Sequence, residues 1–150
     1  NTFNLLSNFG DIEVMLKPHT RTVGNNRLFA NVALPNVADI LTPELCEWAD
    51  VVLVIGSSVI TEALMQGKPV LYLKYLHANT MLFEELGACW TIRNEAELQD
   101  ALQSLRLNVT NLPYQDQDIR KFLSAVVYGG RNERDVLKDY VRFITECTTN

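Results

Sequence analysis

Short aliphatic runs alternate along the chain with longer stretches in which apolar residues recur at helical spacing. The clearest run, Val51 to Ile55, is unbroken, as expected of a strand buried on both faces of a parallel sheet. A turn at Gly56-Ser57-Ser58 follows, then a helix that carries Glu62 and stops at Gly67, then a strand from Pro69 to Leu73. This order predicts a βαβ unit.

The alternation extends in both directions. We expect further strands at Ile12–Leu16, near Leu28–Val32 and at Ala88–Ile92, and helices at Thr42–Trp48, Asn79–Leu86, Glu95–Leu105, Ile119–Val127 and Asn132–Cys147. The predicted fold class is α/β, a Rossmann-like doubly wound parallel sheet with helices on both faces and C-terminal helices. The strands are few for an open sheet, and a missing N-terminal strand would account for that.

Composition narrows the classes of protein. With 150 residues, 47% of them apolar, the chain can form one ordinary core, so we expect a single globular domain over residues 1–150. The net charge of −5, without a cluster of Lys or Arg, argues against nucleic acid as a partner. Three separated cysteines predict neither disulfides nor a metal site, and are typical of a reducing, cytoplasmic compartment. The start at Asn1, without Met, suggests a piece of a longer protein.

Polar residues at the exits of the predicted strands are the candidates for chemistry, because ligands of open parallel sheets bind beyond the carboxyl ends of the strands. The first group is Lys17-Pro18-His19-Thr20-Arg21. Its two cations and imidazole would suit a phosphate. Taken alone, the same five residues are more typical of a solvated polar turn.

The second group is Gly56-Ser57-Ser58, between a buried strand and a helix. Gly allows a tight turn, and the N–H groups of a first helical turn together with Ser hydroxyls can hold an anion. An ordinary Ser N-cap is the alternative. Glu62 lies one helical turn beyond Ser58 on the same face, where it could accept a hydrogen bond from a ribose hydroxyl or stand exposed without a ligand.

The third group follows the next strand and contains His77 and Asn79, which we interpret as candidate donor contacts. Asn79 could serve only as a helix cap, and His77 only as an exposed aromatic residue. The chain has no HExxH motif, no Asp-rich loop and no close His and Cys pairs, so no metal is expected.

The order of these features resembles a known arrangement. The stretch from Ala49 to Val70, ADVVLVIGSSVITEALMQGKPV, is similar to the donor-binding half of GT-B glycosyltransferases and of non-hydrolysing UDP-N-acetylglucosamine 2-epimerases. The segment from Asn79 to Ala88, NTMLFEELGA, resembles the GT-B stretch that follows. CDP-glycerol glycerophosphotransferases of teichoic acid synthesis share a Lys-Pro-His turn like Lys17-Pro18-His19 and a pair like Ser57-Ser58. No single subfamily matches throughout.

The resemblance implies one half of a GT-B fold, with the N-terminal acceptor domain absent from this chain. Ser57 and Ser58 would then meet the donor diphosphate, Glu62 the ribose, and His19 the phosphates from across the cleft. The implied donor is a nucleotide-diphosphate sugar or CDP-glycerol, bound as substrate with no separate cofactor, in bacterial surface polysaccharide synthesis. Peripheral membrane association of the full-length protein stays open.

A rival class is a non-catalytic α/β interaction module, such as a receiver-like domain. A receiver-like domain should carry acidic residues at its strand ends, whereas the strand exits here carry Lys17, Gly56 and Lys74. The opposing interpretation is an enzyme half that binds nucleotide weakly and does not turn over alone.

Overall fold

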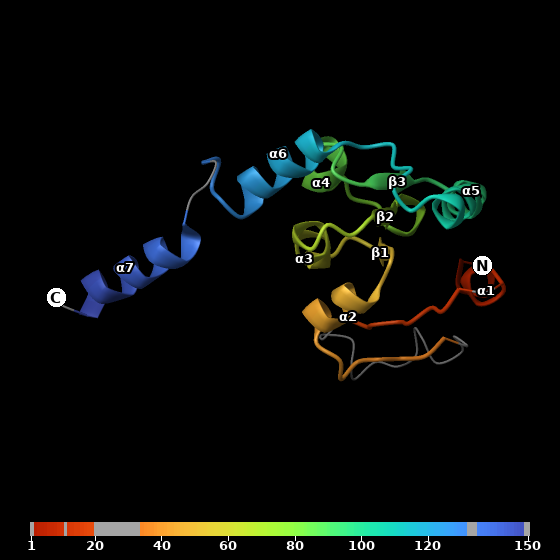
Figure 1. The fold of residues 1–150 in the computed structure, drawn as a ribbon, viewed down its shortest axis with the longest axis horizontal. Coiled ribbons are helices and arrows are strands. Elements are labelled where there is room, and N and C mark those ends of the chain that lie inside the picture. The colour runs from red at the N-terminus through yellow and green to blue at the C-terminus, as the bar shows by residue number, and fades with distance from the viewer. Residues whose placement is uncertain (1, 11, 20–33, 132–134, 149–150) are drawn as a thin grey trace.

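The structure, a computed structural model, describes residues 2–10, 12–19, 34–131 and 135–148 (Figure 1). Within them, three parallel strands form a sheet in the order β1 (Val52–Val54), β2 (Val70–Leu73) and β3 (Trp90–Ile92). Their aliphatic and β-branched residues favour the extended conformation. The prediction of an α/β fold built on a parallel sheet is therefore confirmed, and the architecture is compatible with a Rossmann-like fold.

Helices occupy most of the remaining described chain. They are α1 (Thr2–Ser7), α2 (Thr42–Trp48), α3 (Val59–Met65), α4 (Leu82–Glu85), α5 (Glu95–Leu107), α6 (Asp116–Val126) and α7 (Val136–Thr148), with a 3-10 turn η3 (Lys74–Leu76) directly after β2. Asn94 caps α5, because its side chain accepts a hydrogen bond from the Glu97 N–H at 2.9 Å. A capping box at Gln115 starts α6, three residues before the start that the sequence predicts.

The central strand β2 is buried on both faces, and its alternating side chains serve two separate cores. Val70 and Tyr72 pack with side chains of α3, α4 and α6, whereas Leu71 and Leu73 pack with α1 and α5. Figure 1 accordingly places α3, α4 and α6 on one side of the strands and α5 and α1 on the other. Helices thus cover both faces of the sheet, as predicted.

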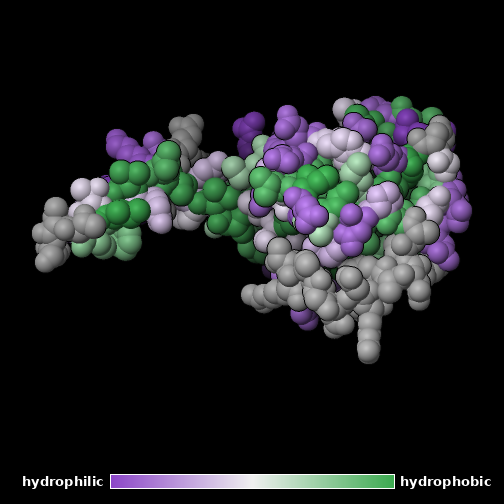
Figure 2. Space-filling model, turned by 90° about the horizontal axis from the view of Figure 1, so that it is seen from below, coloured by the Kyte–Doolittle hydropathy of each residue, from purple (hydrophilic) through white to green (hydrophobic). Residues whose placement is uncertain are grey.

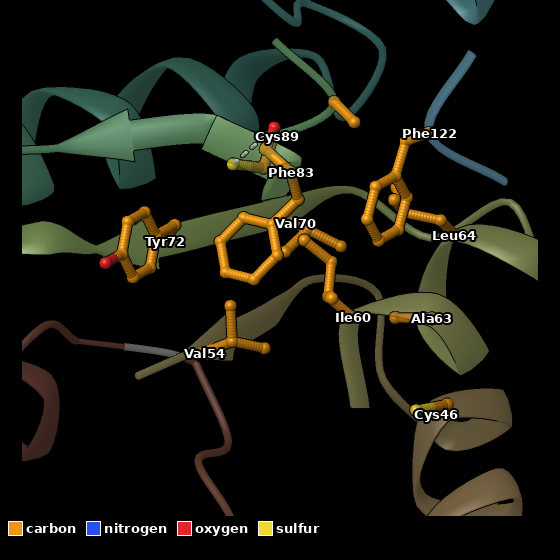
Figure 3. Packing of buried hydrophobic residues seen from close by; sticks show 11 residues of the cluster. Cys46, Val54, Ile60, Ala63, Leu64, Val70, Tyr72, Phe83, Cys89 and Phe122 are labelled. Atoms are coloured by element: carbon orange, nitrogen blue, oxygen red, sulfur yellow. Dashed lines mark hydrogen bonds between the residues drawn. The ribbon is translucent and has the colours of Figure 1, made fainter. Parts of the chain in front are cut away.

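The first of these cores is drawn in Figure 3. Phe83 of α4 contacts the Tyr72 ring edge to face, with ring centroids 5.0 Å apart, and also meets Phe122 of α6 at 6.2 Å. The hydroxyl of Tyr72 points out of this apolar cluster (Figure 3). The ring of Tyr72 therefore belongs to the core, while its oxygen is available to the residues that follow the strands.

Two predicted elements differ in the structure. The segment from Ile12 to Leu16 forms no ladder: Leu16 alone makes an isolated parallel bridge, to Asn36. Two features of the segment disfavour a ladder: Glu13 within it is exposed rather than buried, and Pro18, two residues beyond its end, lacks an amide donor. The helix expected from Asn79 begins at Leu82 instead, because the backbone at Asn79 takes part in the network described below. The strand expected near Leu28–Val32 falls outside the described residues.

The last helix, α7, projects from the rest of the structure (Figure 1). Its apolar side chains lie exposed along it (Figure 2), with 73% exposure for Leu137 and 62% for Phe143. No helix in the described ranges combines the length and the apolar character that crossing a bilayer requires.

Candidate functional site

The candidate site lies at the carboxyl ends of β1 and β2, where two loops meet. One loop runs from Ile55 to Ser58 and joins β1 to α3; the other includes η3 and continues through His77 to Asn79. Because β1 and β2 are adjacent and parallel, both loops leave the same edge of the sheet. This is the edge at which open parallel sheets bind ligands.

Gly56 and His77 form the contact between these loops. Gly56 has a left-handed backbone, with a φ of +59°, which L residues adopt only at a cost. A methyl group at Gly56 would lie 2.6 Å from Nε2, 2.8 Å from Cδ2 and 2.9 Å from Cε1 of His77. The three nearly equal distances show that the imidazole lies with its ring face over Gly56, near Nε2, and no larger residue fits without moving the ring.

The backbone carbonyl of Asn79 is the centre of a polar network beneath His77. It accepts hydrogen bonds from the Tyr72 hydroxyl at 3.1 Å and from Lys74 Nζ at 2.9 Å. His77 Nδ1 lies 3.2 Å from the same oxygen and 3.0 Å from Tyr72 Oη. The loop from His77 to Asn79 is thereby fixed to the end of β2.

Lys74 is already neutralised within the network. Its ammonium forms a half-buried ion pair with Glu84 of α4, with Nζ and Oε2 3.0 Å apart. The same ammonium lies 5.8 Å from the centroid of the Tyr72 ring. Burial raises the pKa of Tyr72, an effect that the charge of Lys74 partly offsets, so Tyr72 remains a neutral hydrogen-bonding group at physiological pH.

Of the first predicted group, the structure describes Lys17, Pro18 and His19. Lys17 Nζ donates to the carbonyl of Ala38 at 3.0 Å and to that of Ile40, so this ammonium holds the chain segment before α2. His19 is exposed. Arg21 lies outside the described residues. The structure thus brings Gly56 and His77 together, and gives Lys17 a structural partner.

The serines and Glu62 occupy the start of α3. Ser57 Oγ accepts a hydrogen bond from the Val59 N–H at 3.3 Å, whereas the side chain of Ser58, the N-cap residue, makes no capping bond. Ser58 and Glu62 are both exposed, one turn apart. Both side chains are therefore accessible to a ligand. Because α3 is only seven residues long, the site depends on its loops rather than on a helix dipole.

Other features of the described chain do not compete with this site. A hollow of about 450 Å³ lies at the opposite edge of the sheet, between Asp50, Lys68, Pro69 and Tyr114, where the strands begin. Such amino-terminal edges are not where parallel sheets bind ligands. Among the residues described, no three His, Cys, Asp or Glu side chains come close enough to hold a metal ion.

Comparison of the chain with protein-family models, with curated proteins and with solved structures finds no match. The resemblance to the GT-B enzymes therefore rests on the motifs alone.

Sequence reasoning finds Gly56, His77 and Asn79 but misses Tyr72 and Glu84. Tyr72 sits within an apolar strand, where the pattern indicates only a core residue. Asn79 contributes its backbone carbonyl rather than its side chain, which no residue pattern can reveal. The one available signal is the tyrosine itself, because a buried phenol needs a hydrogen-bond partner.

Proposed function

We propose that this chain is the nucleotide-donor-binding half of a transferase, which moves a glycosyl group from a nucleotide-diphosphate sugar to an acceptor in surface polysaccharide synthesis. The observation that carries the proposal is the contact of Gly56 with His77. It joins two strand-exit loops, each of which carries polar residues of the GT-B-like motifs, at the ligand-binding edge of a parallel sheet.

The chemistry assigned to this half is support of the leaving group. An acceptor hydroxyl oxygen forms a bond to the anomeric carbon, the bond from that carbon to the diphosphate oxygen breaks, and its electron pair stays on the diphosphate. The acceptor proton passes to a base on the N-terminal domain that we expect in the full-length protein. Hydrogen-bond donors of the loop from Gly56 to Ser58 stabilise the charge on the departing diphosphate.

Calorimetric titration of the folded chain with UDP-, CDP- and GDP-sugars and with CDP-glycerol tests the proposal. Binding to one of them at about 1 mM or tighter is the expected result. A Ser57→Ala variant should weaken binding about tenfold, the effect of one lost hydrogen bond to a charged group. Glu62→Ala should weaken it about tenfold as well, since the hydrogen bond from a ribose hydroxyl to the charged carboxylate is lost.

Glu47→Ala is the matched control for Glu62→Ala, because Glu47 is an exposed glutamate on the neighbouring helix α2. The affinity of the Glu47→Ala variant for the nucleotide donor should equal that of the unaltered chain. Failure of a folded sample to bind any of these donors would refute the proposal and favour the non-catalytic interaction module.

A further inference from the structure

We draw no further inference here: the strongest candidate, the exposed apolar face that Leu137, Tyr140 and Phe143 form on the projecting helix α7, carries none because nothing in the described part of the chain shows what covers it.

Discussion

Gly56→Ala is the change to which the candidate site should respond most strongly. The new methyl group would lie 2.6 Å from His77 Nε2, closer than any unstrained contact, and the backbone would remain at a φ of +59°. To relieve the contact, His77 must move away from the hydrogen-bonding partners of its Nδ1, Tyr72 and the carbonyl of Asn79.

The loss of stability can be worked out from the cost of the backbone conformation and from the displacement of His77. A left-handed backbone costs an L residue about 1–2 kcal/mol. Alanine also lowers the conformational entropy of the unfolded chain, which offsets about 0.4–1 kcal/mol of this cost. Displacement of the imidazole loses up to two hydrogen bonds of about 1 kcal/mol each. The free energy of unfolding should therefore fall by about 3 kcal/mol, which lowers Tm by about 6–12 °C for a chain of this length.

Gly67→Ala is the matched control. Gly67 has a similar φ of +70°, but a methyl group there would meet nothing within 4 Å. This variant carries the backbone cost alone, so its free energy of unfolding should fall by only about 1 kcal/mol. Thermal and urea unfolding of both variants gives the comparison, and the difference of about 2 kcal/mol measures the contact with His77.

A double-mutant cycle completes the test. In a His77→Ala background, Gly56→Ala should cost no more than Gly67→Ala, since the imidazole is gone, and the coupling energy should be about 2 kcal/mol. Additive effects of Gly56→Ala and His77→Ala, or equal costs of the two glycine substitutions, would show that the imidazole does not rest on Gly56. The site as described would then be wrong.

Three further predictions concern the frame around the site. Tyr114→Phe should lower the free energy of unfolding by about 1–3 kcal/mol in urea, because the buried N–H of Val70 loses its acceptor at 2.8 Å, and a smaller loss would contradict that role. Burial raises the pKa of Cys89 from 9.0 to about 11, so the folded chain keeps a proton that the unfolded chain loses. The free energy of unfolding should then fall as the pH rises from 9 to 11, and it should fall less steeply in the Cys89→Ala variant. At pH 8, Ellman's reagent should label the exposed Cys147 before the two buried cysteines. Removal of residues 131–150 should leave the free energy of unfolding of the remaining chain unchanged within about 0.5 kcal/mol, since α7 projects away from it. A larger loss of stability would mean that α7 packs against the remaining chain.

The sheet could be predicted because its strands carry a pattern that burial on two faces imposes. Val51 to Ile55 contains the observed strand β1 with one residue to spare at each end, and Pro69 to Leu73 contains β2 with one residue to spare at its start. The segment from Ile12 to Leu16 carries a similar pattern and forms only a bridge at Leu16. Residue type sets the tendency to be extended, but a ladder also needs a partner strand, which a local pattern cannot supply.

The sequence predicts where the candidate site lies but not which side-chain and backbone contacts form it. Topology alone brings the exits of β1 and β2 to one edge, so the sequence places both polar groups there, but it does not predict the contact of Gly56 with His77. The network beneath them depends on the direction of the Tyr72 hydroxyl and on the path of the backbone at Asn79. Both are set by tertiary packing, because the Tyr72 ring is fixed against Phe83 and the chain must turn before α4.

The two lysines that the sequence analysis places at strand exits show why a count of charges is a poor guide to an anion site. The sequence places Lys17 and Lys74 where a phosphate would need them, and the structure directs both ammonium groups to backbone carbonyls, Lys74 also to Glu84. A carbonyl at the end of a strand or turn lacks a ladder partner, and a long cationic side chain nearby satisfies it.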